Sequence, residues 1–201
     1  MTPKSLSVPV VLFIFNRPDT TEKVFQVVRQ ARPRKMFVVA DGPRPNHAEE
    51  VTKCLQSRAI VQKIDWECDL KIRYSATNVG IKFQFEQGLN WVFSLVEQAI
   101  ILEDDCIPHP DFFSFCEELL KRYQDKPQIM SISGEGGLSL STQHISYGFS
   151  RYPLSWGWAT WRRAWQQYDP LMSQWPVLRE SVCLHNLFHD PNATDYCFKS
   201  F

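Results

Sequence analysis

The sequence lacks a long apolar run. None approaches the roughly 18 residues of a membrane-spanning helix, and the N-terminus has neither the apolar core nor the cleavage site of a signal peptide. We therefore expect a cytoplasmic protein with no transmembrane segment, and leave peripheral attachment to a membrane open. Net charge is also lacking, because 22 basic side chains balance 22 acidic ones and no basic block stands out. This argues against nucleic acid as the main partner.

Paired cysteines and repeats are absent too. The six cysteines are scattered, with no Cys-x-x-Cys pair and no Cys/His spacing of the kind that binds zinc. We expect them to be reduced and mostly buried. With 201 residues and no linker, the chain suits a single domain over 1–201. Its last residues, 195–201, are apolar and uncapped, so we expect a C-terminally truncated fragment.

What the sequence has is a regular alternation of apolar runs with segments of helical periodicity. Strands are predicted at 8–15, 36–40, 71–75, 99–102 and 128–133, and helices at 18–31, 48–60, 82–97 and 111–123. Such alternation indicates an α/β fold with a twisted, mainly parallel sheet, right-handed crossovers and helices on both faces. A polar stretch from 134 to 148 is a candidate mobile loop.

The most informative motif follows the predicted strand at 99–102. Glu103, Asp104 and Asp105 come in a row before a proline-rich corner. Adjacent carboxylates repel one another, so they tend to surround a cation or lie on a wet rim. This motif favours a metal site at the carboxyl end of a strand, where open α/β sheets bind ligands. The alternative is a solvated loop whose Asp111 caps the next helix.

Polar residues also follow the other predicted strands. Arg17 comes after the first, Asp41 after the second and Asn78 after the third. A nucleotide diphosphate sugar fits this set: an acidic residue can bind the ribose or base, arginine and lysine can meet phosphate, and carboxylate-held Mn²⁺ or Mg²⁺ can bridge the diphosphate. The ion would act as a Lewis acid that helps the nucleotide depart.

Tryptophans gather in the second half of the chain. Trp158, Trp161 and Trp165 have the spacing of one helical face, and for the latter two we favour a hydrophobic stripe covering the sheet. The tripeptide Trp156-Gly157-Trp158 is different, because a glycine between two indoles lets the backbone approach a ligand. Aromatic faces beside an acidic site suit a sugar, so we predict that this tripeptide binds one.

Together these segments resemble the GT-A glycosyltransferases, and in particular bacterial family-2-like enzymes and the N-acetylglucosaminyltransferase I group. The resemblance is carried by four segments, each weak alone, in matching order and spacing. They are Phe13-Ile14-Phe15-Asn16-Arg17-Pro18, Val38-Val39-Ala40-Asp41-Gly42, Ile101-Leu102-Glu103-Asp104-Asp105-Cys106 continuing to Phe113, and Trp156-Gly157-Trp158-Ala159-Thr160-Trp161. The resemblance implies a GT-A (Rossmann-like) fold. It also implies metal-dependent transfer of a sugar from a nucleotide diphosphate donor to a glycan or other hydroxyl acceptor. UDP is the nucleotide it favours, and the transfer would proceed with inversion.

By position, the resemblance implies that Arg17 lies near the nucleotide phosphates and that Asp41 holds the uracil. Lys82 falls where the family has a nucleotide-contacting basic residue. It replaces a histidine there, so the resemblance does not fix the nucleobase. The alternatives are a surface charge before a helix for Arg17 and a solvated helix start for Lys82.

In the acidic motif, the resemblance implies that Glu103 and Asp104 touch the donor sugar and ribose, and that Asp105 ligates the metal. The donor-binding half would be 1–133, and 134–201 an incomplete acceptor half. The family's general base follows the tryptophan segment, in a motif that this chain lacks. Asp190 and Asp195 are the late carboxylates, and neither has tryptophan neighbours.

Two other functions remain open from the sequence. A sugar-phosphate nucleotidylyltransferase shares the nucleotide-binding architecture, but it would carry a glycine-rich basic loop where this chain has Asn16-Arg17-Pro18. A nucleotide-sugar-binding domain without transferase activity also fits, because no base is found.

Overall fold

The computed structural model describes residues 5–135 and 146–179. The chain divides into two compact units, one of Met1–Gln143 with Pro153–Gln167, and one of His144–Tyr152 with Tyr168–Phe201. The second unit holds the short helix α6 (Trp175–Leu178). All the other described elements lie in the first. A single domain over 1–201, with halves at 1–133 and 134–201, stays a prediction.

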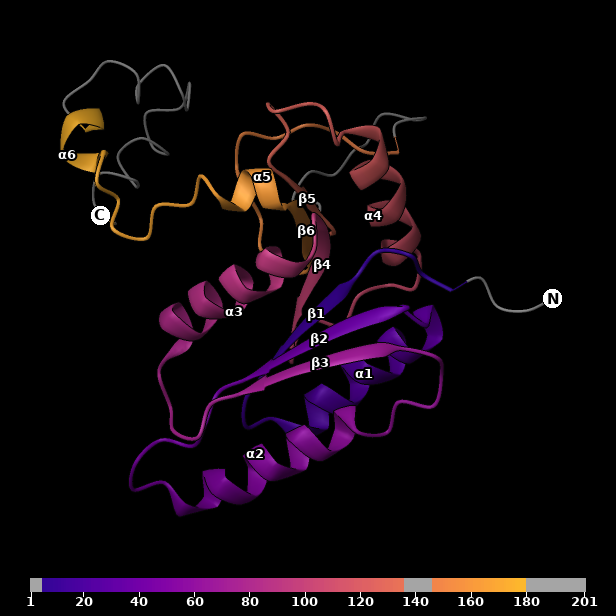
Figure 1. The fold of residues 1–201 in the computed structure, drawn as a ribbon, viewed down its shortest axis with the longest axis vertical. Coiled ribbons are helices and arrows are strands. Elements are labelled where there is room, and N and C mark those ends of the chain that lie inside the picture. Colours follow the sequence, from indigo (N-terminus) through magenta and orange to yellow (C-terminus); the bar gives the residue numbers. More distant parts are fainter. Residues whose placement is uncertain (1–4, 136–145, 180–201) are drawn as a thin grey trace. The chain divides into compact units, whose positions relative to one another are not determined.

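The first unit is built on one six-stranded sheet (Figure 1). Its strands are β1 (Val10–Ile14), β2 (Lys35–Ala40), β3 (Asp69–Tyr74), β4 (Gln98–Glu103), β5 (Ser131–Ser133) and β6 (Trp158–Trp161). They are ordered β3-β2-β1-β4-β6-β5. The first four in this order are parallel, whereas β6 runs antiparallel to β4 and β5. The predicted α/β class with a mainly parallel sheet is confirmed.

Helices cover both faces of the sheet, as predicted. They are α1 (Pro18–Ala31), α2 (Ala48–Val61), α3 (Ile81–Leu95), α4 (Asp111–Arg122) and the short α5 (Arg162–Trp165). Helices α1 and α2 lie on one side of the sheet and α3 on the other (Figure 1). On the α3 side, Leu89 and Val92 pack against Val11 and Phe13 of β1 in one buried cluster. Burial on both faces explains why the central strands are continuous apolar runs.

The tryptophan segment departs from the predicted helical face. Trp158 and Trp161 lie in strand β6, opposite Ile101 and Gln98 of β4, and only the next four residues are helical. The prediction that Trp158, Trp161 and Trp165 share a helical face is therefore wrong. Hydrogen bonding to two neighbouring strands, distant in sequence, overrides the local spacing. The strand predicted at 128–133 is likewise shorter, at Ser131–Ser133.

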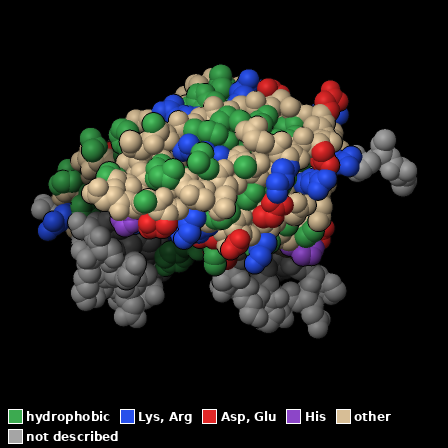
Figure 2. Space-filling view, turned by 90° about the horizontal axis from the view of Figure 1, so that it is seen from below, with side chains coloured by type: hydrophobic (Ala, Val, Ile, Leu, Met, Phe, Trp, Pro, Cys, Tyr) green, Lys and Arg blue, Asp and Glu red, His purple; other side chains and the backbone are tan. Residues whose placement is uncertain are grey.

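The described surface mixes charges of both signs. On the face shown in Figure 2, basic and acidic side chains lie beside one another, and no described part of that face forms a basic block. None of the described helices is long and apolar enough to cross a membrane.

Candidate functional site

The predicted site residues meet at the carboxyl edge of the sheet. Because β1, β2, β3 and β4 are parallel, the segments that follow them leave from the same edge. Arg17 follows β1, Asp41 follows β2, Asn78 follows β3, and Glu103 ends β4. Side chains from four loops therefore converge on one strip of the surface.

Asp41 ties two of these loops together. Its buried carboxylate accepts hydrogen bonds from the backbone N–H of Gly42 (2.8 Å), Val79 (3.0 Å) and Gly80 (3.1 Å), and from the Asn78 side-chain amide (2.9 Å). Four donors occupy the two carboxylate oxygens from within the chain. In this structure Asp41 fixes the loop that precedes α3. Its predicted contact with a base would therefore be made by that loop and not by the carboxylate itself.

The acidic motif has an internal counter-charge. The Arg17 guanidinium contacts both Asp104, at 3.3 Å, and Asp105. The second Asp104 oxygen accepts the backbone N–H of Phe15 at 2.9 Å. Burial raises the pKa of Asp104, and the bonds from Phe15 and Arg17 oppose that rise. The ion pairs join the segment after β1 to the end of β4, and the predicted contact of Arg17 with nucleotide phosphates stays a prediction.

Glu103 lacks such compensation. Its half-buried carboxylate receives no hydrogen bond from the described residues. Burial raises the pKa of Glu103, and the charges of Asp105 and Asp104 raise it further, with only Arg17 acting in the opposite direction. An uncompensated carboxylate beside two others favours a cation or a hydroxyl donor as its partner.

The residues present fit a divalent ion only in part. Carboxylate oxygens suit Mn²⁺ and Mg²⁺, and one Asp105 oxygen has no described partner. Yet no group of three or more His, Cys, Asp or Glu side chains that could hold a metal occurs among residues 5–135 and 146–179. Both Asp104 oxygens already accept hydrogen bonds, one from the Phe15 backbone N–H and one from the Arg17 side chain. An ion here would need further ligands, such as the oxygens of a diphosphate.

The tripeptide at 156–158 lies next to the acidic motif. Trp158 pairs with Ile101 in β4, and a β-carbon on Gly157 would lie 3.7 Å from the Leu102 side chain. Gly157 has φ 73°, which a residue with a side chain seldom adopts. Trp156 is 60% exposed, whereas Trp158 packs against the core beneath α3. Trp156 is thus the indole that a ligand can reach.

Trp161 and Trp165 are structural, as the sequence favoured. Trp161 is buried and donates its ring N–H to the Leu120 carbonyl. Trp165 packs against Phe93 and donates to the Asn90 side chain at 2.8 Å.

Lys82 lies in the first turn of α3 and is exposed. It makes no hydrogen bond or ion pair to a described residue, so its predicted contact with a nucleotide stays a prediction. Asp190 and Asp195, and residues 136–145 of the predicted mobile loop, lie outside the described residues.

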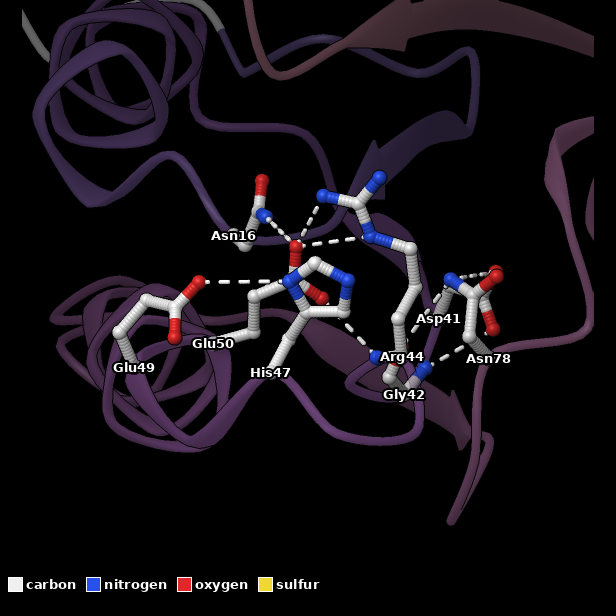
Figure 3. A network of polar contacts seen from close by, with 8 residues as sticks. All are labelled: Asn16, Asp41, Gly42, Arg44, His47, Glu49, Glu50 and Asn78. Atoms are coloured by element: carbon white, nitrogen blue, oxygen red, sulfur yellow. Dashed lines mark hydrogen bonds and ion pairs between the residues drawn. The ribbon is translucent and has the colours of Figure 1, made fainter.

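Sequence reasoning missed an ion pair beside this site, in which a buried carboxylate holds a half-exposed arginine (Figure 3). Glu50, in the first turn of α2, is 2% exposed and accepts hydrogen bonds from Arg44 and from the Asn16 side chain. An acidic residue early in a helix is common at solvated helix starts. The signal that could have found Glu50 is its helical spacing with Cys54 and Val61 on the buried face of α2, which Glu49 does not share.

No family model and no curated protein matches the chain. Among the solved structures that superpose on it in part are the following two. A mannosyltransferase from Pyrobaculum calidifontis, in complex with GDP-Man and Mn²⁺, gives a TM-score of 0.44 at 16% identity over 65% of this chain and 35% of that one. A 4-diphosphocytidyl-2C-methyl-D-erythritol synthase from Anaerococcus prevotii gives 0.48 at 11% identity over 84% of this chain and 80% of that one. This chain thus spans about a third of the length of the mannosyltransferase. Structural similarity at this level carries no argument about activity.

Proposed function

We propose that this chain binds a nucleotide diphosphate sugar with Mn²⁺ or Mg²⁺ and belongs to a glycosyltransferase that moves the sugar to an acceptor hydroxyl with inversion. UDP is the first donor nucleotide to test. One observation carries the proposal: Arg17, the loop at Asp41 and Asn78, and the carboxylates 103–105 share one sheet edge. A single extended molecule can therefore contact the residues proposed to bind its phosphates, its base and its metal ion.

The charges at this edge support a role for each residue. Arg17 now pairs with both Asp104 and Asp105. A divalent ion bound at Asp105 together with a diphosphate would supply Lewis-acid stabilisation of the leaving nucleotide. Arg17 is then free to turn its guanidinium to a phosphate oxygen, a geometry that suits its planar fork. Glu103, and the Asp104 oxygen that Arg17 releases when it turns, would bind the ribose and sugar hydroxyls, and Trp156 offers an exposed ring for the sugar's apolar face.

Calorimetry with UDP and GDP, each with and without Mn²⁺, tests the proposal. We expect Mn²⁺ to raise nucleotide affinity by about tenfold or more, and Asp105→Asn to abolish that gain. Asp111→Asn is the matched control, because this aspartate lies just beyond the motif with its side chain 88% exposed. A gain of equal size in Asp105→Asn would refute the metal assignment.

Products separate transfer from the two alternatives. A glycosyltransferase releases nucleoside diphosphate from the sugar donor. A nucleotidylyltransferase releases pyrophosphate from a nucleoside triphosphate and a sugar phosphate, and a binding domain releases neither. The loop Asn16-Arg17-Pro18 has no glycine, which favours the first of these over the second.

A further inference from the structure

The Arg44–Glu50 pair lies between two loops of the proposed nucleotide site. Arg44 follows the segment 41–43 after β2, and the Pro43 carbonyl in that segment accepts the backbone N–H of Asn78 at 3.1 Å. On its other side, the Glu50 carboxylate also binds Asn16, the residue just before Arg17. In Figure 3 the Glu50 carboxylate is joined to both the Arg44 side chain and the Asn16 amide.

Glu50 holds this guanidinium rigidly. Its carboxylate accepts the Arg44 backbone N–H at 2.9 Å, Nε–H at 2.9 Å and a further bond from Nη2, and the Asn16 amide at 3.0 Å. These contacts, the Arg44 side chain first among them, lower the pKa of Glu50 to about 2. The carboxylate is therefore ionised at neutral pH, as the ion pair requires.

The exposed part of Arg44 differs from that of Arg17 in its chemistry. The Arg44 side chain is 53% exposed although its carboxylate partner is only 3% exposed. The Nη1 atom has no hydrogen bond to a described residue. The single positive charge of the guanidinium is balanced by the single negative charge of Glu50. A fixed, planar and neutralised guanidinium attracts phosphate weakly, but it presents a face and an N–H edge to another planar ring.

From this geometry we infer that Arg44 contacts the nucleobase of the bound nucleotide and that Glu50 is its positioning residue. The inference rests on the proposed function and assigns Arg44 to the base, leaving the diphosphate to Arg17 and the metal. The base lies against the open face of the guanidinium, with a ring carbonyl able to accept from Nη1.

Two probes separate base from phosphate: UDP or GDP, whichever the wild-type chain binds more tightly, and inorganic pyrophosphate, both with Mn²⁺. We expect Arg44→Met to weaken nucleotide binding by about tenfold, the loss typical of a removed stacking partner, and to leave pyrophosphate affinity within about twofold. Arg44→Lys, which keeps the charge but loses the plane, should behave like Arg44→Met. It also carries the test if the methionine variant does not fold.

Glu50→Gln keeps Arg44 but removes the charge that fixes it. We expect a smaller, selective loss of nucleotide affinity, about threefold, again with pyrophosphate unaffected. Lys53→Met, at an exposed position of the same helix, is the control and should bind both probes as the wild type does.

Equal losses for both probes in Arg44→Met would overturn the base assignment in favour of a phosphate contact or general loosening. No loss for either probe would place Arg44 outside the site. In both cases the proposed function survives. If the wild-type chain binds neither probe, the proposed function falls, and this inference falls with it.

Discussion

Gly42 approaches the backbone of Thr77 so closely that a β-carbon at residue 42 would lie 2.6 Å from both N and C of Thr77. The nearest atom of Ala76, also backbone, would be 2.7 Å away. Rotating a side chain cannot relieve contacts with backbone. This approach brings the segment after β2 against the segment after β3, and it lets Asp41 reach the N–H groups of Val79 and Gly80.

Gly42→Ala should therefore destabilise the protein and weaken nucleotide binding together. We expect a loss of about 1–3 kcal/mol in the free energy of unfolding, as for an overpacked site, measured by urea denaturation. Gly148→Ala is the control, because a β-carbon there meets nothing within 4 Å and the change should stay within about 0.5 kcal/mol. Similar losses in the two variants would contradict the steric explanation.

The sequence was sufficient where local pattern decides structure. The apolar residues of β2, which Asp41 follows, and of β4, which ends at Glu103, were located because buried parallel strands are continuous apolar runs. Helix α4 begins at Asp111 as predicted, because the prolines at 108 and 110 prevent an earlier start.

The sequence was not sufficient where contacts between distant segments determine the structure. The spacing of Trp158, Trp161 and Trp165 suits a helix, and only pairing with β4 and β5 makes β6 a strand. The Arg44–Glu50 pair was missed for the same reason, because burial of one glutamate among several depends on the packing of α2 against the loops. The saturation of Asp41 by backbone donors from another loop could not be foreseen either.

Arg163 forms several hydrogen bonds with the backbone of the segment that follows α4. Its guanidinium donates to four backbone carbonyls and lies 4.4 Å from the centre of the Trp161 ring. The carbonyls belong to Tyr123, Gln124, Lys126 and Ile129. Carbonyls at and beyond a helix C-terminus have no partner within the helix, so Arg163 supplies the bonds they would otherwise lack.

Arg163→Met should cost about 1–3 kcal/mol in the free energy of unfolding, because it leaves several of these carbonyls unsatisfied. Arg73→Met is the control: Arg73 is exposed and bonds only to the Gln87 side chain among the described residues, so a change within about 0.5 kcal/mol is expected. Both are measured by urea denaturation. A loss no larger than that of Arg73→Met would show that water replaces the Arg163 bonds.

The acidic motif should make stability and binding respond to pH in opposite directions. The pKa of Glu103 is raised from 4.5, by burial and then by Asp105 and Asp104. A carboxyl with a raised pKa favours the folded state when protonated. Its contribution is therefore full below pH 4.5 and is lost as the pH rises through the raised value. Binding of a metal–nucleotide complex needs the ionised form and improves over the same range.

Glu103→Gln removes this charge at every pH. We expect its melting temperature to exceed that of the wild type by about 1–2 °C at pH 7.5, a modest gain because the group is half exposed, and to converge with it toward pH 4.5. Affinity for UDP with Mn²⁺ should fall at the same time. Glu67→Gln, at an exposed position, should change neither quantity. A pH-independent gap in melting temperature would mean that ionisation of Glu103 is not its cause.

Trp156 should contribute to binding of the sugar and not of the nucleotide. It is 60% exposed, so Trp156→Ala should leave the melting temperature unchanged. Gly157 beside it is buried against the end of β4, so the tripeptide backbone lies beside the strand that carries the carboxylates. Loss of one aromatic face against a sugar ring corresponds to about 1 kcal/mol, or about fivefold in affinity.

We therefore expect Trp156→Ala to weaken binding of UDP-glucose or GDP-mannose, whichever the wild type binds, by about fivefold, and to leave the matching nucleoside diphosphate unaffected. Trp156→Phe should restore most of the loss, because it retains a ring. Leu95→Ala, which removes a 48% exposed apolar side chain at the end of α3, is the control and should bind both ligands normally. Equal weakening of sugar nucleotide and nucleotide by Trp156→Ala would place the indole at the nucleotide, because only a contact with the sugar distinguishes these two ligands.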